Sequence, residues 1–399
     1  MSALNYRPGS PGPAARRPGR GGILRRLRRD DRGGVATVFG VLFAGGVLLG
    51  MLALVVDVGQ LYVEREELQS GADAAAIAVA KSCAADLSTC TDVNRRNIAG
   101  RYATDNARDR AADAPTICGS VAGVADLFPC PAQADNLTRC IDGATSGSGR
   151  YLEVRTSTAT SDGSTLLPPS FARALLGNED YAGTTVGACA RVSWGAPKAG
   201  LAVTFSKCEW DHATKNGEHF PAAPPYPANP IPSPADAYEI VLRTHDSKDR
   251  SSLCPGEKGP PGWDAPGGFG WLKDDGACKT ETFTAGPTGV VEKNCTEVLE
   301  PVTTGASAAK VLYIPIYDTV AGTGSKAKYH ITGMAAFVPT GYFLGTPAAK
   351  RRASWLTGKE YCSGEDRCLY GYFVDVLQPG PVETGPLDPL GATVISLIG

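Results

Sequence analysis

The longest uninterrupted apolar stretch of the chain runs from Gly33 to Val56 and holds 24 residues without a charged side chain. As an α-helix it would be about 36 Å long, against about 30 Å for the hydrocarbon core of a bilayer. It is too long for the apolar region of a secretory signal, and no small-residue cleavage site precedes the sequence VDVGQLYVER. We therefore expect residues 33–56 to form a transmembrane helix, with a buried helix of a soluble protein as the alternative.

Beyond Asp57 the pattern remains helical. No proline occurs between Pro18 and Pro115, and proline breaks the interior of a helix, so the helix is predicted to continue into a stalk or hairpin over residues 57–114. A break is expected at 86–89, after which Thr91 or Asp92 can cap a second helix running towards residue 112. Two cysteines, Cys83 and Cys90, flank this break, so a disulfide between them can staple the turn.

An apolar seam follows one face of the predicted stalk, formed by Leu61, Leu68, Ala72, Ala75 and Val79. Such a seam packs either against the chain's own exterior domain or against a neighbouring helix, and the spacing leaves both open. Inside the membrane stretch, Gly46 and Gly50 form a G-x-x-x-G pattern that permits close helix contact. The expected partners are therefore the lipid bilayer and, through these helices, a second copy of the chain.

After residue 115 short β-prone runs alternate with Gly- and Pro-rich loops. The runs are 151–158, 186–194, 201–205, 237–243, 309–317, 329–338 and 369–377, with one short helix predicted at 170–176. The predicted fold class is α+β: a single transmembrane helix, an extracytoplasmic helical stalk, and a disulfide-rich, mainly antiparallel β exterior domain. The expected domains are a disordered tail at 1–32, the membrane helix at 33–56, the stalk at 57–114, a small α+β region at 115–197 and the exterior at 198–399.

The distribution of charge supports the predicted transmembrane helix and predicts its orientation. Residues 1–32 contain nine arginines and two aspartates, a formal charge of +7, so the rest of the chain carries −9 of the total of −2. The positive-inside rule places this tail in the cytoplasm and everything after Asp57 outside. An arginine cluster can also bind nucleic acid, but beside a spanning helix topology is the simpler account, and no nucleic acid partner is expected.

The positions of the cysteines support the same membrane orientation. All 12 lie beyond the apolar stretch: Cys83, Cys90, Cys118, Cys130, Cys140, Cys189, Cys208, Cys254, Cys278, Cys295, Cys362 and Cys368. An even number confined to the exported side indicates disulfides formed in an oxidising compartment. A metal site built on cysteines is the alternative, but no C-x-x-C pair occurs. The spacing does not determine which cysteines pair.

The stretch from Arg32 to Ala80 resembles the N-terminal module of the TadE/TadG-like proteins of the tight-adherence (Flp) pilus system. The positions that carry the resemblance are Asp57, Gly59, Tyr62, Arg65, Leu68, Gln69, Ala72, Asp73, Ala74 and Ala75. The cysteine-containing remainder is similar to the exteriors of actinobacterial TadG-like proteins, through motifs such as Cys208-Glu-Trp and Pro315-Ile-Tyr-Asp. The resemblance implies a structural role in assembling or anchoring an adhesive surface pilus, with other pilus-assembly or pilin subunits as partners.

The resemblance also allows a test of whether the N-terminus is cleaved. Minor pilins of this system are cut after a glycine and carry glutamate as the fifth residue of the mature chain. A cut at Gly33 would leave Val38 at that place, so a retained anchor in the bacterial cytoplasmic membrane is expected. A soluble product released by processing is the alternative.

No catalytic constellation is predicted, and no cofactor or metal is expected. The sequence lacks a G-x-S-x-G elbow and a phosphate-binding loop. His212 and His219 could share a metal on one loop, although their surroundings are typical of a solvated loop. The adjacent Asp274 and Asp275 favour surface charge over a catalytic pair, and PGGFGW is either a binding loop or a turn under Trp271. The competing function is a membrane-tethered ligand-binding protein or ectoenzyme.

Overall fold

The computed structural model of the protein describes residues 33–133, 149–159, 184–224, 238–244, 254, 257–258, 261, 264–265, 267–281, 293–302, 309–322, 326–380 and 382–399. The chain divides into two compact units. The first contains residues 1–60 and 169–181, and the second contains residues 61–168 and 182–399. The helix predicted at 170–176 lies outside the described residues.

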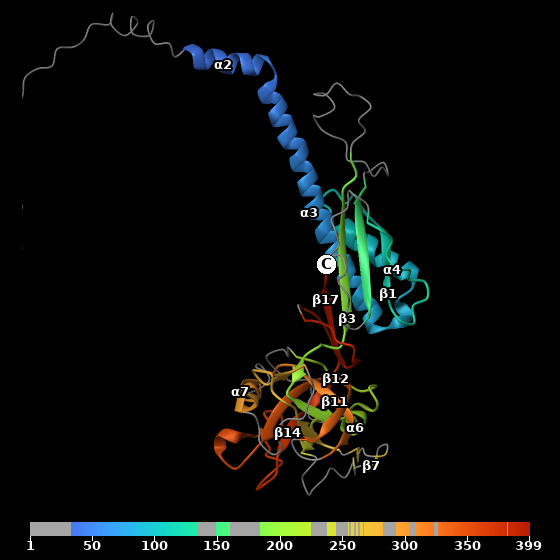
Figure 1. The fold of residues 1–399 in the computed structure, drawn as a ribbon, viewed down its shortest axis with the longest axis vertical. Coiled ribbons are helices and arrows are strands. Elements are labelled where there is room, and N and C mark those ends of the chain that lie inside the picture. The colour runs from blue at the N-terminus through green and yellow to red at the C-terminus, as the bar shows by residue number, and fades with distance from the viewer. Residues whose placement is uncertain are drawn as a thin grey trace, which may run out of the picture. The chain divides into compact units, whose positions relative to one another are not determined.

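The apolar stretch is divided between two helices. Helix α2 spans Gly33–Ala44 and helix α3 spans Val47–Ala85, with a turn at Gly45 and Gly46 (Figure 1). Gly46 has a φ of +71°, which lies outside the right-handed helical region and is readily adopted by glycine. In this structure residues 33–56 therefore form two helices, where the sequence predicted one continuous transmembrane helix. No helix among the described residues has both the length and the apolar character needed to cross a bilayer.

The helical region after residue 57 follows the prediction closely. Helix α3 continues to Ala85, and the break beyond it contains a 3₁₀ turn, η1 (Leu87–Thr89), capped by the Asp86 carboxylate. Helix α4 spans Asp92–Asn106, and its N-cap is Thr91, whose hydroxyl accepts a hydrogen bond from the Asn94 amide. The disulfide between Cys83 and Cys90 closes the turn. The predicted break, cap and staple are thus confirmed, but α4 ends six residues earlier than the predicted limit at residue 112.

The first sheet contains five strands in the order β1-β2-β3-β17-β15. Their bounds are Ala112–Ser120 for β1, Tyr151–Thr158 for β2, Gly187–Gly195 for β3, Val376–Pro379 for β15 and Ala392–Leu397 for β17. Strand β1 was not predicted, because Pro115 interrupts its pattern. The structure accommodates this proline at a bulge between Asp113 and Thr116 on an edge strand, where a missing N–H costs least.

The core of this part lies between the sheet and the α3 and α4 helices. Four of the five seam residues, Leu68, Ala72, Ala75 and Val79, are almost completely buried there, together with Leu152, Val154, Ala188, Ala190, Val192 and Trp194. A side chain on Gly71 would lie 3.2 Å from the Ala103 Cα atom, so α3 and α4 approach each other closely at this glycine. The structure therefore decides the open question about the seam, which packs within the chain itself.

A second, larger sheet has the strand order β6-β14-β12-β11-β5-β9, with shorter strands added at its margins. The principal strands are β5 (Val203–Ser206), β6 (Ile240–Arg243), β9 (Phe269–Trp271), β11 (Leu312–Ala321), β12 (Lys328–Phe343) and β14 (Cys368–Val374). The shorter ones are β4 (Gly200–Leu201), which pairs with β10 (Lys279–Thr280), and β7 (Glu257–Lys258), β8 (Asp264–Ala265), β13 (Arg351–Arg352) and β16 (Asp388–Leu390).

Most of these strand pairs are antiparallel, as predicted, and β11 with β5 and β12 with β16 are parallel exceptions. Helices α6 (Lys207–Thr214) and α7 (Lys293–Val302) and the 3₁₀ turn η5 (Ala348–Lys350) complete the described elements of this part. Its core is aromatic: the Phe205 ring meets those of Phe337 and Phe373 edge-on, with ring centroids 4.9 and 6.1 Å apart. Edge-on contacts of this kind stabilise aromatic cores beyond the area they bury.

The chain returns to the first sheet at its C-terminal end. Strand β17 pairs antiparallel with β3, and β15 pairs in parallel with β17. Both strands come from the range 198–399, which the sequence analysis assigned to the exterior domain. Sequence patterns did not reveal this return, because the pairing joins residues about two hundred positions apart.

Five disulfides are formed among the described cysteines. They join Cys83 to Cys90, Cys118 to Cys130, Cys208 to Cys254, Cys278 to Cys295 and Cys362 to Cys368. Cys189 is also disulfide-bonded, whereas Cys140 lies outside the described residues. None of the described cysteines is free, so the prediction of disulfides is confirmed and their connectivity comes from the structure.

Removing the staple between α3 and α4 should lower stability. Replacing both Cys83 and Cys90 with alanine opens a loop of about eight residues, which should lower the free energy of unfolding by about 2 kcal/mol. Urea denaturation followed by circular dichroism measures this change. Because the loss arises in the unfolded chain, the far-ultraviolet spectrum of the folded variant should be unchanged. An unaltered urea midpoint would contradict the stapling role.

Candidate functional site

Large apolar side chains are exposed on α2 and on the described part of the first turns of α3. We define the apolar N-terminal segment as residues 34–56. Its large exposed side chains are Val35, Val38, Phe39, Val41, Phe43, Met51, Leu52, Leu54 and Val55, each more than half exposed. A water-soluble helix normally has one apolar face, whereas a helix that is apolar all round is normally covered by protein or lipid. The apolar N-terminal segment therefore requires a covering partner.

The first charged residue after this segment is Asp57, and its side chain is buried. Gly46 lies in the turn before α3, so the two glycines of the G-x-x-x-G pattern do not share one helix face. The Gly50 amide donates a hydrogen bond to the Gly46 carbonyl, 2.7 Å away, in the first turn of α3. A side chain at Gly59 would meet nothing within 4 Å, and Tyr62 is 64% exposed. These positions leave a surface of α3 open to a partner.

Further along α3, the positions that carry the family resemblance fix the helix to the first sheet. The Gln69 amide nitrogen donates to the Cys189 carbonyl at 3.1 Å and to the Asp73 carboxylate at 2.9 Å. The Thr156 hydroxyl donates to the Leu68 carbonyl at 2.9 Å, and Leu68 itself is buried. Leu68 and Gln69 thus hold α3 against β2 and β3, and Asp73 supports the Gln69 amide from the same helix. Their role in this structure is to position the helix.

Two carboxylates on α3 have raised pKa values. Burial raises the pKa of Asp73, and the hydrogen bond from Gln69 partly offsets this rise. Burial also raises the pKa of Glu64, assisted by the negative charges of Asp109 and Glu67. Both groups lie at the packed side of α3, so their shifts follow from desolvation in the helix interface.

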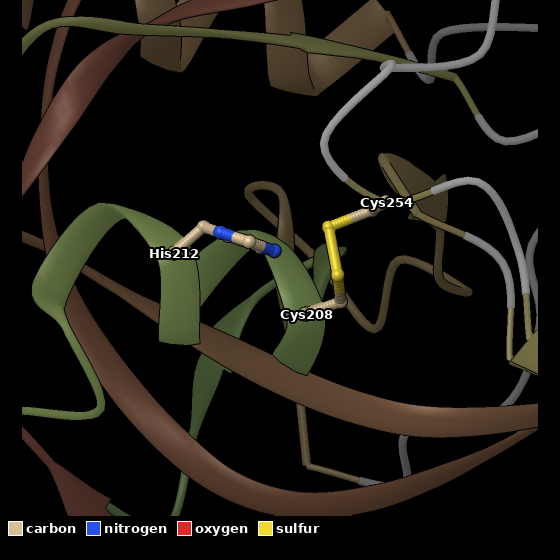
Figure 2. Close-up of side chains that lie close together, drawn as sticks. All are labelled: Cys208, His212 and Cys254. Carbon is tan, nitrogen blue, oxygen red and sulfur yellow. A yellow bond between two sulfur atoms is a disulfide. The ribbon is translucent and has the colours of Figure 1, made fainter.

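The groups of possible metal ligands among the described residues are all built around disulfides. Figure 2 shows one of them, in which the His212 side chain from α6 lies beside the bonded sulfur atoms of Cys208 and Cys254. The second joins Cys118 and Cys130 with Glu153, and the third joins Cys362 and Cys368 with Asp366. A thiolate is the metal ligand that cysteine supplies, and a disulfide has none to offer.

His212 lies within α6 and His219 lies in the loop that follows, and no described metal-ligand group brings the two histidines together. His212 lies near the disulfide, whereas the His219 ring faces that of Tyr238 with centroids 6.4 Å apart. No metal-ligand group among the described residues contains His219.

The two other candidate sites have structural roles. The Asp274 carboxylate accepts hydrogen bonds from the Gly276 and Lys279 amides, so it closes a tight turn. In the PGGFGW stretch, Phe269 and Trp271 are buried, and a side chain on Gly270 would collide with the Tyr329 hydroxyl. Residues 267–271 therefore form a packed turn and strand, which favours the turn under Trp271 over a binding loop.

Sequence reasoning missed a buried ion cluster on the first sheet. The Glu153 carboxylate is completely buried and lies 2.8 Å from the Arg155 guanidinium and 2.6 Å from that of Arg191. Arg155 also donates hydrogen bonds to the carbonyls of Pro131 and Ala132. The alternation Glu-Val-Arg in β2 indicated that both charges share one face, but only the fold covers that face and brings Arg191 across from β3.

Breaking this cluster should be costly. Glu153→Gln leaves two guanidinium groups poorly compensated in a largely buried place, so the free energy of unfolding should fall by about 3–5 kcal/mol. Adding Arg191→Gln should cost less than the sum of the two single changes, because the partners interact directly. Denaturant unfolding of the two single variants and the double variant measures this coupling. Additive losses would show that the contact contributes nothing.

Asp73 gives a pH-dependent prediction. The pKa of Asp73 is higher in the folded protein than in the unfolded chain, so ionised Asp73 destabilises the fold. The free energy of unfolding therefore falls as the pH rises from the pKa of the unfolded chain through the pKa of the folded protein. Asp73→Asn keeps an acceptor for Gln69 without the charge, so it should raise the melting temperature slightly at neutral pH. The difference should vanish once acid protonates Asp73 in both states. Thermal unfolding across this pH range, with exposed Glu66→Gln as control, tests the sign. A lower melting temperature for Asp73→Asn at neutral pH would contradict it.

The N-terminal helical region matches a known protein family. No curated protein and no solved structure matches the chain. Residues 33–82, which include α2, most of α3 and the Leu68, Gln69 and Asp73 contacts, match the family described as putative Flp pilus-assembly TadE/G-like.

Proposed function

We propose that this protein acts structurally in the assembly or anchoring of a Flp-type pilus, held in the bacterial cytoplasmic membrane by its apolar N-terminal segment. The observation that carries the proposal is the coincidence of two features. The TadE/G-like match begins at residue 33, and its first part, the apolar N-terminal segment, contains nine large apolar side chains that are each more than half exposed. The family supplies the pilus-related role, and the exposed apolar surface supplies the reason for a membrane partner.

The proposed topology follows from charge and disulfides. Nine arginines precede the apolar N-terminal segment, and all 12 cysteines follow it. Arginine is retained on the cytoplasmic side during insertion, and disulfides form on the opposite, oxidising side. The tail at 1–32 is therefore cytoplasmic in this proposal, and the two sheets are extracytoplasmic.

The work assigned to the exterior part is contact with pilus components. The possible metal-ligand groups described in this part are built around disulfides, so they offer no thiolate to a metal. On α3, a side chain at Gly59 would meet nothing within 4 Å and Tyr62 is exposed, so this helix surface can contact another subunit. In this proposal the part of α3 that packs on the first sheet presents its exposed residues for contact with other subunits. No catalytic step and no cofactor enter this proposal.

The membrane anchor is tested by placing a charge in the apolar N-terminal segment. Phe43→Arg should block stable insertion, because a charge at the centre of a spanning helix costs about 2.5–3.5 kcal/mol. Fractionation of cells followed by carbonate extraction measures the result, and the wild-type chain should resist extraction. Val93→Arg is the matched control, since Val93 is a comparably exposed apolar residue on α4 outside the segment.

The pilus role has its own readout. Deleting the gene should abolish or sharply reduce surface pili and adhesion, and expression of the wild-type chain should restore both. Phe43→Arg should fail to restore them, whereas Val93→Arg should succeed. Unchanged pili after deletion would overturn the function while leaving the anchor intact.

A further inference from the structure

The break at Gly45 and Gly46 lies within the segment that the proposed function places in the membrane. Figure 1 shows α2 turning away from the start of α3 at this point. Twelve residues of α2 amount to about 18 Å of helix, and the ten apolar residues of α3 before Asp57 amount to about 15 Å. Neither part alone matches a hydrocarbon core of about 30 Å, whereas the two in line exceed it.

Backbone hydrogen bonds define what must change for the two parts to align. The Gly45 amide donates to the Val41 carbonyl at 2.7 Å in a normal helical bond. The Gly46 amide instead donates to the Phe43 carbonyl at 3.2 Å, a spacing of three residues. A continuous helix requires the Gly46 amide to bond to Leu42 and the φ of Gly46 to change from +71° to a negative value. The interconversion therefore centres on one residue.

Solvent decides which form is favoured. Two adjacent glycines weaken a helix in water by about 1 kcal/mol each, and water can satisfy the backbone groups that a break releases. Lipid cannot satisfy them, and each unpaired group there costs several kcal/mol. Lipid therefore selects the continuous helix, and a wetter surrounding permits the bent one.

We propose that Gly46 is a hinge, through which the apolar N-terminal segment changes between the bent form and a continuous helix that spans the bilayer. The inference rests on the proposed membrane function and adds a means of regulating it. The bent form is too short to span, so bending the hinge weakens the hold of the membrane on the chain.

Two glycines in the segment provide a matched pair of variants. A side chain at either Gly40 or Gly46 would meet nothing within 4 Å, so alanine fits at both positions without a clash. Only Gly46 has a positive φ. Alanine disfavours the left-handed conformation, so Gly46→Ala should lower the population of the bent form by about tenfold. Gly40→Ala lies inside α2 and should leave that population unchanged.

The experiment measures the distance across the hinge in the full-length protein. None of the described cysteines is free, so cysteines introduced by Val38→Cys and Val55→Cys can carry nitroxide labels while the native disulfides stay intact. In a continuous helix these positions are about 26 Å apart. Pulsed electron spin resonance should show this one distance in phosphatidylcholine and phosphatidylglycerol vesicles, and an additional shorter distance in short-chain detergent micelles.

In the micelles, Gly46→Ala should lose the shorter distance and Gly40→Ala should keep it. The hinge is overturned if the wild-type protein shows the same distance distribution in vesicles and micelles, or if Gly46→Ala retains the shorter distance. These outcomes are independent of cell fractionation with Phe43→Arg. A chain that fails to anchor in cells can still bend at Gly46, and a chain that anchors can do so without bending.

Discussion

The close packing of α3 on the first sheet is the interaction on which the second unit depends. Alanine residues on the buried face of the helix allow its backbone to approach the sheet, and Gly71 allows α4 to approach α3. The Gln69 side chain bonds to the Cys189 carbonyl, and the Leu68 carbonyl accepts the Thr156 hydroxyl. Both contacts are side-chain hydrogen bonds that join α3 to the strands β3 and β2.

The residues of the family match fall into two groups with different surroundings, and the packing of α3 on the first sheet separates them. Residues 33–82 include an apolar part with exposed side chains and a docked part with buried ones. The first leaves large apolar side chains exposed, whereas the second packs against β2 and β3. The division also accounts for the raised pKa of Asp73, because docking half-buries its carboxylate beside Gln69.

Disulfides and buried charge hold the remaining parts together. Short disulfide loops pin the α3–α4 turn and the end of β1, and Glu153 joins β2 to β3 through two arginines. The second sheet depends on an aromatic core around Phe205. Of these, the disulfides fit the extracytoplasmic location that we propose, because such bonds persist in oxidising compartments.

The sequence by itself determined the local elements: the long helix beyond Asp57, the Thr91 cap, the strands β2, β3, β5, β6, β11, β12 and β14, and the presence of disulfides. These follow from periodicity, capping chemistry and cysteine number, which depend on residues close together in the chain. Only the tertiary structure decided the bend at Gly46, the disulfide partners, the direction in which the apolar seam packs, and the return of β17 to β3. Each of these depends on which distant residues come together, or on which of two conformations open to glycine is adopted, and a local pattern is compatible with more than one answer.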